Sequence, residues 1–188
     1  MLWLWIVIGV VVIFLIIPFI ATFNGLVRLR NQVKNAWAQI DVQLKRRYDL
    51  IPNLMETVKG YMTHERETLE AVTNARNLAQ QSSSASAGER AKVEGELSSA
   101  LSRLLVVVEN YPDLKANQNF LALQEELTST ENKISFSRQY YNDSVLRYNN
   151  KTQMFPSNII AGMTGFKASE FFEVTVAAER EAPKVSFS

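Results

Sequence analysis

Cysteine is absent from this chain of 188 residues, and histidine occurs once. Without cysteine the chain has no disulfide framework, no Cys-ligated zinc or iron–sulfur cluster, and no thiolate nucleophile. One histidine excludes metal sites that draw several histidines from one chain. Seven glycines and five prolines are too few for an all-β domain with many turns. The scarce residue types therefore disfavour most classes of enzyme and an all-β fold.

Charge is missing from the start of the chain. Residues 1–23 read MLWLWIVIGVVVIFLIIPFIATF, and the first charged side chain is Arg28. A helix of this length spans roughly 30 Å, the thickness of the hydrocarbon core, and satisfies its own backbone polar groups in lipid. A cleaved signal peptide would need a basic start and a small-x-small cleavage site, which this segment lacks. We therefore expect residues 1–25 to be a permanent anchor, with its interfacial and bending residues at Trp3, Trp5, Pro18 and Phe23.

A basic collar follows the apolar run. Residues 24–48 contain six basic side chains and one acidic side chain, Asp41. The positive-inside tendency then predicts that the N-terminus lies outside and the rest of the chain lies in the cytoplasm. The first part of the collar is expected to contact anionic headgroups at about 1 kcal/mol per residue, whereas Lys45–Arg47 suit a solvated helix face. The collar residues that we assign to the membrane interface are Arg28, Arg30 and Lys34.

Residues 26–155 carry apolar side chains at helical spacing and are expected to form the cytoplasmic domain. One proline, Pro52, interrupts the first long segment, and it either kinks one helix or starts a second. The Ser-rich stretch 81–88 is expected to be a loop between antiparallel helices, and the next helix is expected over 89–111. Pro112 ends that helix, and Asp113 is the expected cap of the next one.

The segment 114–155 has the most regular pattern, because large apolar side chains recur every seven residues. Such a stripe needs other helices to cover it. We therefore predict an all-α fold, in which a single transmembrane helix precedes an antiparallel, up-and-down bundle of long helices resembling a four-helix bundle. The stripe is interpreted first as core, with a ligand groove as the alternative. Its members are Phe120, Leu127, Ile134, Tyr141, Tyr148 and Phe155.

The last segment, 156–188, has a different character. Ser157 is expected to cap a short helix, and Gly162 and Gly165 are expected to end it. The apolar side chains of this segment are expected to fold back on one end of the bundle, and docking on the membrane or on a partner is the alternative. The final residues are expected to form an extended tail.

Two crowded polar clusters are the candidate network or interaction residues. In an antiparallel bundle, buried hydrogen bonds between such groups would fix the register of the helices, provided that every member is satisfied. Tyrosine, arginine and asparagine are also typical of protein interfaces, so recognition of a partner stays the alternative. The candidates are Arg46, Arg47, Tyr48, Asp49 and Asn53 in the first cluster and Tyr141, Asp143, Arg147 and Tyr148 in the second.

No motif indicates catalysis, a metal or a cofactor. His64 and Glu65 resemble half of a zinc-protease HExxH motif, but residue 68 is Thr, so His64 is expected on a helix surface. The acidic residues Glu125, Glu126 and Glu131 lack the histidines of a di-iron site and suit ion pairs within a helix. The chain has no Gly-rich phosphate loop and no basic–aromatic interleaving for nucleic acid. We therefore expect no enzyme activity, no cofactor, no small-molecule substrate and no nucleic-acid partner.

Taken together, the chain resembles the LemA family of bacterial membrane proteins. The resemblance depends on RRYDLIPNL (46–54), YPDLKAN (111–117), FPSNIIA (155–161) and APKVSF (182–187), and it covers nearly the whole chain outside the Ser-rich loop. It implies a cytoplasmic helical bundle behind an N-out anchor in the bacterial inner membrane.

The resemblance also bears on function. Family members are often encoded beside membrane metalloproteases of the HtpX type or TPM-domain proteins, and a magnetosome relative is tied to membrane biogenesis. The resemblance thus implies a scaffold or adaptor whose expected partners are the lipid bilayer, further copies of the chain and a membrane protease. A membrane-shaping oligomer is the alternative function.

Overall fold

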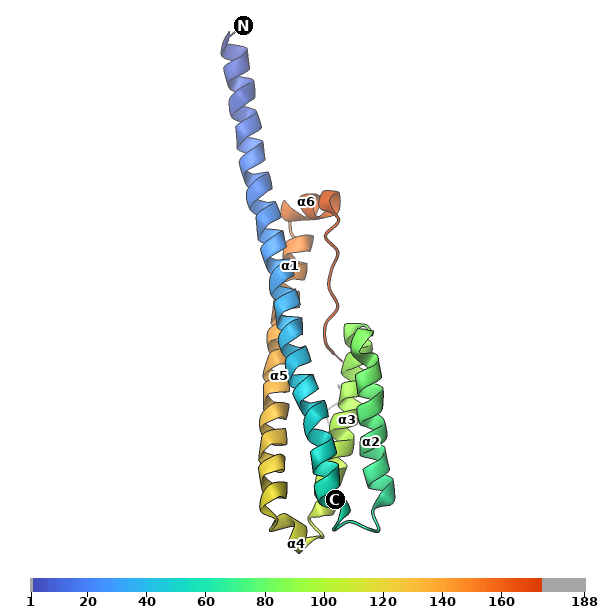
Figure 1. The fold of residues 1–188 in the computed structure, drawn as a ribbon. Coiled ribbons are helices and arrows are strands. Elements are labelled where there is room, and N and C mark those ends of the chain that lie inside the picture. Colours follow the sequence, from blue (N-terminus) through green and yellow to red (C-terminus); the bar gives the residue numbers. More distant parts are fainter. Residues whose placement is uncertain (1, 174–188) are drawn as a thin grey trace, which may run out of the picture. The chain divides into compact units, whose positions relative to one another are not determined.

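The computed structural model describes residues 2–173 of the chain, and the predicted extended tail falls outside this range. The described part is all-α, as predicted, and begins with one long helix (Figure 1). The first part of this helix is apolar. The elements are α1 (Leu2–Lys59), α2 (Arg66–Gln81), the 3-10 turn η1 (Ser82–Ser84), α3 (Ala87–Val108), α4 (Pro112–Lys115), α5 (Gln118–Gln153) and α6 (Ser157–Thr164).

Helix α1 runs through both of its prolines without a break. The helix ends instead at Lys59, where the amides of Tyr61 and Met62 both donate to the Val58 carbonyl, at 3.0 and 2.9 Å. Of the two alternatives left open by the sequence, Pro52 therefore does not start a second helix. The turn that follows Gly60 was not anticipated, because the apolar period continues across it.

Helices α2 and α3 pack against each other as a hairpin. The predicted Ser-rich loop is confirmed in a shorter form, because α2 continues to Gln81 and a capping box at Ser86 starts α3. In this box the Glu89 amide donates to the Ser86 hydroxyl, and the Ser86 amide donates to the Glu89 carboxylate, at 3.4 and 3.3 Å. Two amides that have no partner within the helix are thereby satisfied.

The connection from α3 to α5 contains the short helix α4. The cap of α4 is Tyr111 and Pro112 occupies its first turn, so Asp113, the predicted cap of the long helix, lies inside α4 instead. Asn117 then caps α5, because its side-chain oxygen accepts from the amides of Asn119 and Phe120 at 2.9 and 3.1 Å.

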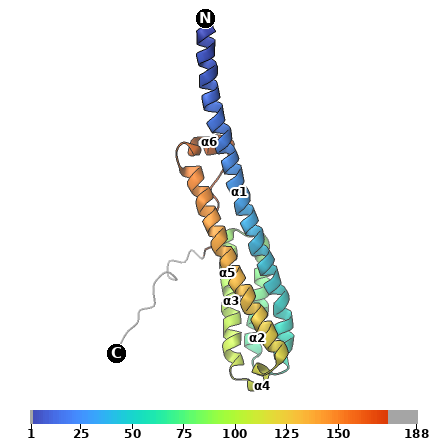
Figure 2. The ribbon, with the colours of Figure 1, turned by 90° about the vertical axis from the view of Figure 1, so that its left-hand side faces the viewer.

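The chain divides into two compact units. Among the described residues, unit 1 consists of 2–45 and 130–169, and unit 2 consists of 46–129 and 170–173. In unit 2 the end of α1, α2, α3 and the start of α5 follow one another with alternating direction, which is the predicted antiparallel arrangement of four helical segments (Figures 1 and 2). The sequence predicted a different division, which follows the order of the chain: an anchor (1–25), a bundle (26–155) and a C-terminal segment (156–188). That division stays a prediction.

The seven-residue stripe of α5 forms core in both units. Its first five members are buried, each with at most 5% of its surface exposed, as the core interpretation predicts. The sixth, Phe155, is 79% exposed, because α5 ends at Gln153 and the stripe no longer faces a neighbouring helix. Thr130 and Ser144 are also buried on α5, so small side chains allow its neighbours to approach closely.

Unit 1 closes with α6 and the segment that follows it. The cap of α6 is Pro156 rather than the predicted Ser157, whose buried hydroxyl instead shares its one hydrogen between the carbonyls of Lys151 and Met154, at 2.6 and 2.8 Å. Gly165 ends the helix with φ 74°, a left-handed conformation that favours glycine, whereas Gly162 lies inside the helix. The prediction that a glycine ends α6 is thus confirmed for Gly165.

Candidate membrane and interaction sites

The first part of α1 is an exposed apolar rod. It contains the one helical window within residues 2–173 that is long and apolar enough to span a membrane, and none of that window is buried. Trp3 and Trp5 lie at its start with 78% and 71% of their surfaces exposed, and Pro18 is also exposed within the helix. A soluble protein would cover a surface of this kind, so the exposure agrees with contact with lipid.

The end of the apolar run is covered by the segment after α6. Phe23 packs edge-on against Phe166, with 5.8 Å between the ring centroids, and the Arg30 guanidinium lies over the same ring at 4.9 Å. Cation–π contacts of this kind stabilise by about 0.5–1 kcal/mol when exposed. Arg30 therefore contacts the protein, and Arg28, Arg30 and Lys34 are all exposed; their contact with headgroups stays a prediction.

The first polar cluster separates into an inner and an outer set. Arg47 and Tyr48 are buried, with 1% and 7% of their surfaces exposed. Arg46, Asp49 and Asn53 are exposed and lie outside the buried network. Arg46 pairs with Glu126 of α5, so that glutamate makes an ion pair between helices.

Helix α3 supplies the partners of the inner set. The Glu94 carboxylate accepts from Arg47 and from the Tyr48 hydroxyl, and Arg47 also donates to the Ser98 hydroxyl at 2.9 Å. Arg90 lies one turn before Glu94, with 4.0 Å between its Nε and a carboxylate oxygen. Arg90 and Glu94 are each only 4% exposed. We call Arg47, Tyr48, Arg90 and Glu94 the buried cluster.

The α3 half of the buried cluster was missed, although the sequence carries a signal for it. Ala87, Glu94, Leu101 and Val108 follow a seven-residue rhythm and are all buried, so a charged side chain occupies a core position of α3. Arg90 likewise occupies a core position, because it lies seven residues before the buried Leu97. A charge within an apolar stripe indicates a buried partner on another helix.

Burial and charge act together on Tyr48. Burial raises the pKa of its phenol most, and the hydrogen bond to the Glu94 carboxylate raises this pKa further, against an opposing effect of Arg90 and Arg47. The phenol is thus held in its neutral, donating form. All these contacts lie within unit 2, which favours the interpretation that Arg47 and Tyr48 fix helix register.

The same segment explains how α1 tolerates Pro52. A proline has no amide hydrogen, so the carbonyl four residues earlier, that of Tyr48, loses its helical donor. Arg76 of α2 supplies the replacement, because its Nε donates to the Tyr48 carbonyl at 2.8 Å. Pro52 and Arg76 together therefore fix the axial register of α2 against α1.

The second cluster also divides into buried and exposed members, but its buried members are neutral side chains. Tyr141 is buried and packs against Trp37 of α1 with 5.1 Å between ring centroids, whereas Asp143 and Arg147 are exposed. The Tyr148 hydroxyl donates to the Lys167 carbonyl at 2.9 Å. Burial raises the pKa of this phenol, and Arg30 opposes the shift.

Asn149, next to Tyr148, binds the backbone of Ser169 twice. Its side-chain nitrogen donates to the Ser169 carbonyl at 2.9 Å, and its side-chain oxygen accepts from the Ser169 amide at 2.8 Å. We call Tyr148 and Asn149 the backbone clamp, because they hold residues 167–169 through main-chain atoms.

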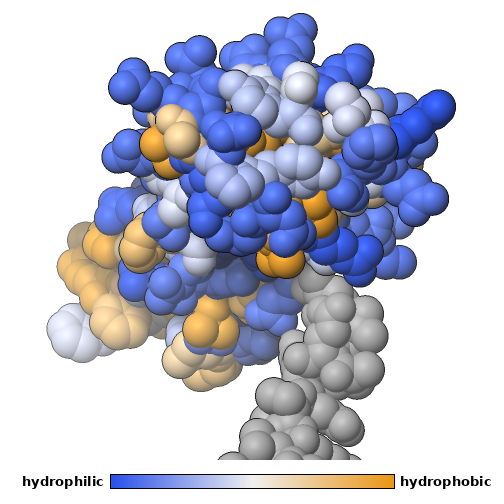
Figure 3. Space-filling model, turned by 90° about the horizontal axis from the view of Figure 1, so that it is seen from below, coloured by the Kyte–Doolittle hydropathy of each residue, from blue (hydrophilic) through white to orange (hydrophobic). Residues whose placement is uncertain are grey.

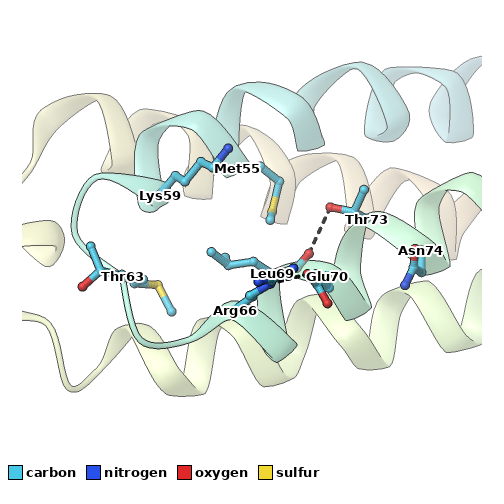
Figure 4. A pocket seen from close by; sticks show the side chains of 9 residues that line it. Met55, Lys59, Thr63, Arg66, Leu69, Glu70, Thr73 and Asn74 are labelled. Atoms are coloured by element: carbon cyan, nitrogen blue, oxygen red, sulfur yellow. Dashed lines mark hydrogen bonds and ion pairs between the residues drawn. The ribbon is translucent and has the colours of Figure 1, made fainter.

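A shallow groove of about 500 Å³ lies between the end of α1 and α2 (Figure 4). Met55 of α1 and Leu69 of α2 contribute apolar side chains to its lining. Arg66 and Glu70, which form an ion pair of 2.6 Å, also line it. His64 is exposed at a bend of the nearby turn, so its predicted position on a helix surface was wrong. Figure 3 views this end of unit 2, where most of the near surface is hydrophilic and the hydrophobic spots are small and separate.

The acidic and histidine side chains do not gather into a metal site. Within residues 2–173, no group of three or more His, Cys, Asp or Glu side chains is arranged to hold a metal ion. The expected lack of a metal and of catalysis is a prediction that this geometry leaves open to experiment.

Comparison with known proteins places the chain in a family. The LemA family profile matches residues 36–187. Protein LemA of Metamycoplasma hominis is 30% identical over 161 residues, which cover 81% of this chain and 72% of that protein. Magnetosome protein MamQ 2 of Paramagnetospirillum magneticum is 33% identical over 86 residues, which cover 46% of this chain and 32% of that protein. The breadth of the first two matches shows that this chain belongs to the LemA family.

Proposed function

We propose that this chain is a non-enzymatic, single-pass adaptor of the bacterial inner membrane, which presents its helices to other membrane proteins or to further copies of itself. The observation that carries the proposal is α1, one uninterrupted helix that contains the apolar run and then enters both packed units. A continuous helix couples the anchor to the packed helices of unit 1 without a flexible linker. Unit 1 would therefore be presented close to the bilayer.

Confinement to a membrane supplies the mechanism. Tethering two proteins to one surface raises their effective concentration, so weak contacts suffice for association. The net charge of +1 argues for protein rather than nucleic acid as the partner. The basic collar argues for a cytoplasmic location of the helices. A membrane metalloprotease of the HtpX type and a second copy of the chain are the partners that the family resemblance suggests.

The ionisable groups support a structural role. Glu94, Arg47 and Arg90 are buried in contacts within the chain, and Glu126 is paired on the surface. The groove between α1 and α2 is lined by other ionisable side chains, Lys59, Arg66 and Glu70, of which Arg66 and Glu70 form an ion pair. We therefore infer that the chain acts through binding rather than through catalysis.

Site-directed photo-crosslinking in cells tests the proposal. The probe positions are Val106 on α3 and Leu121 on α5, exposed apolar side chains with 70% and 48% of their surfaces accessible. A photoreactive residue at either position should yield a discrete product, identified by mass spectrometry as a second copy or as one membrane protein. A probe at Glu96, exposed on α3, is the matched control. Identical diffuse products at all three positions would contradict the adaptor proposal.

A membrane-organising oligomer is the second candidate, because the chain is similar to magnetosome proteins over 86 residues. Liposomes that contain the purified chain at high density distinguish it from the adaptor. Tubulated or unevenly curved vesicles in electron micrographs would favour the second candidate, and unaltered vesicles would argue against it.

A further inference from the structure

A second apolar surface lies in unit 1, at the turn from α5 into α6. No charged residue occurs between Lys151 and Lys167, and both of these lysines are exposed. Within the segment four large apolar side chains are also exposed. Their accessible fractions are 62% for Met154, 79% for Phe155, 53% for Ile159 and 75% for Met163.

The exposed side of α6 is defined by helical geometry. Ser157 and Ala161 are buried, and they lie four residues apart on the side that faces the protein. Ile159 and Met163 are also four residues apart, and about half a turn separates them from the buried pair. The helix is therefore apolar on the side that the described protein leaves open.

A turn at the end of α6 and one ring contact place this helix beside the end of the apolar run. The left-handed turn at Gly165 brings the Phe166 amide to the Ala161 carbonyl at 3.0 Å and directs the chain toward α1. The Phe166 ring then packs on Phe23, the last residue of the apolar run. Figures 1 and 2 both show α6 beside α1, with the rest of the apolar rod continuing beyond it.

This placement argues for one occupant of the exposed surface. Phe23 and Arg28 are separated by about 7.5 Å of helix, so the contact with Phe166 lies where hydrocarbon gives way to headgroups if α1 spans the bilayer. Apolar side chains at that level, bracketed by lysines, are typical of segments that lie in a membrane interface. Lysines at the two ends can extend their ammonium groups to phosphates while their stems stay in apolar surroundings.

We propose that α6, together with Met154 and Phe155, is a second membrane contact of this chain. It lies in the headgroup region of the leaflet from which α1 emerges, and Ile159 and Met163 face the acyl chains. The inference rests on the spanning anchor of the proposed function and on no partner protein. With two contacts, unit 1 has a fixed height at the membrane surface rather than swinging about a single helix.

Because the chain has no cysteine, single-cysteine labelling tests the proposal directly. Met163→Cys is labelled with an environment-sensitive fluorophore in the full chain, which is reconstituted into vesicles of phosphatidylcholine and phosphatidylglycerol. Phe136→Cys is the matched control, because Phe136 is exposed and apolar in the same unit. Phe136 also lies about 25 Å along α5 from the end of that helix.

We expect lipids with a shallow nitroxide to quench the label at 163 several-fold more than the label at 136, and aqueous iodide to give the opposite order. Equal iodide quenching at both positions would overturn the proposal. A label at 163 that is protected from iodide but not quenched by the lipid nitroxide would also overturn the proposal. If that protection disappears when the protein is diluted in lipid, the occupant of the surface is a second copy of the chain.

A charged variant provides an independent test. Met163→Asp should leave the helical circular dichroism unchanged and reduce lipid quenching of a label at Ile159→Cys by about half, because a carboxylate resists entry into the interface. Unchanged quenching would contradict the proposed depth. Failure of the chain to stay in vesicles at all would refute the anchor and hence the proposed function. A retained chain with a water-exposed α6 would refute this inference alone.

Discussion

The two units bury their polar groups in different ways. Unit 2 buries charge, with Arg47, Arg90 and Glu94 meeting between α1 and α3. Unit 1 buries the neutral groups of Tyr148 and Asn149, which bind main-chain atoms of an extended segment. A buried charge is costly unless its partner is present, whereas a neutral hydrogen bond contributes modestly and costs less to lose. The register of unit 2 should therefore depend on single side chains more than the register of unit 1 does.

The largest expected effect is loss of the carboxylate in the buried cluster. Glu94→Gln should lower the free energy of unfolding by about 3–5 kcal/mol, because Arg47 and Arg90 would stay buried after the carboxylate that they share is lost. Urea unfolding of the full chain in mild detergent, followed by circular dichroism, measures the effect. Glu126→Gln is the control, since it removes the exposed pair with Arg46 and should cost about 0–1 kcal/mol. An equal loss of unfolding free energy in the two variants would show that the buried ion pair contributes no more to stability than the exposed one.

The backbone clamp of unit 1 should give a smaller effect. Asn149→Ala removes both hydrogen bonds to Ser169 and should cost about 2 kcal/mol. Hydrogen exchange of the Ser169 amide should accelerate with it, because that amide loses its acceptor. Asn150→Ala is the matched control, because Asn150 is the exposed neighbour on the same helix. Unchanged exchange in Asn149→Ala would show that the clamp does not hold the segment in solution.

Loss of the Arg76 hydrogen bond that compensates for Pro52 should lower the free energy of unfolding by about 1 kcal/mol. Arg76→Met removes the donor to the Tyr48 carbonyl. In a Pro52→Ala background the restored amide of residue 52 can donate to the same carbonyl, so the loss should shrink. A double-mutant cycle on the free energy of unfolding measures this coupling. Additive effects would mean that the arginine does not replace the missing helical hydrogen bond.

The smallest expected effect is on the pH dependence of stability. Because the pKa of Tyr48 is raised in the folded state, its contribution is fully present below about pH 10 and is lost as the unfolded phenol ionises above it. The free energy of unfolding should thus fall with pH in that range, and Tyr48→Phe should flatten the fall.

Tyr148→Phe provides the comparison with unit 1. Burial also raises the pKa of Tyr148, but Arg30 opposes the shift and no carboxylate adds to it. Its substitution should therefore flatten the alkaline fall less than Tyr48→Phe does. An equal or larger flattening would show that Glu94 does not contribute to the shift of Tyr48.

Helical patterns were predictable where the environment is simple. The apolar run needs no partner in the chain to be helical, and the stripe of α5 repeats every seven residues, so both were read correctly from local spacing. Phe155 was assigned to the core because the pattern does not reveal where α5 ends. Gly60 was overlooked as the end of α1 because Pro52 is the stronger helix breaker by intrinsic preference.

The candidate sites depended more on contacts distant in sequence. Arg47 and Tyr48 were predicted as network residues, but nothing near them identifies Glu94, 47 and 46 residues further along the chain, as the partner of both. Likewise, the sequence left open whether α6 faces the protein, a partner or the membrane.

The sequence by itself determined that this protein is helical, that its first helix suits a bilayer, and that it belongs with the LemA proteins. These properties follow from composition and local periodicity, which act over a few residues. The tertiary structure decided which polar groups are buried together, how α1 continues through Pro52, and where α6 lies against α1. Those outcomes depend on which carbonyls and charges are left unsatisfied after the helices pack, and only the packed helices bring their partners within reach.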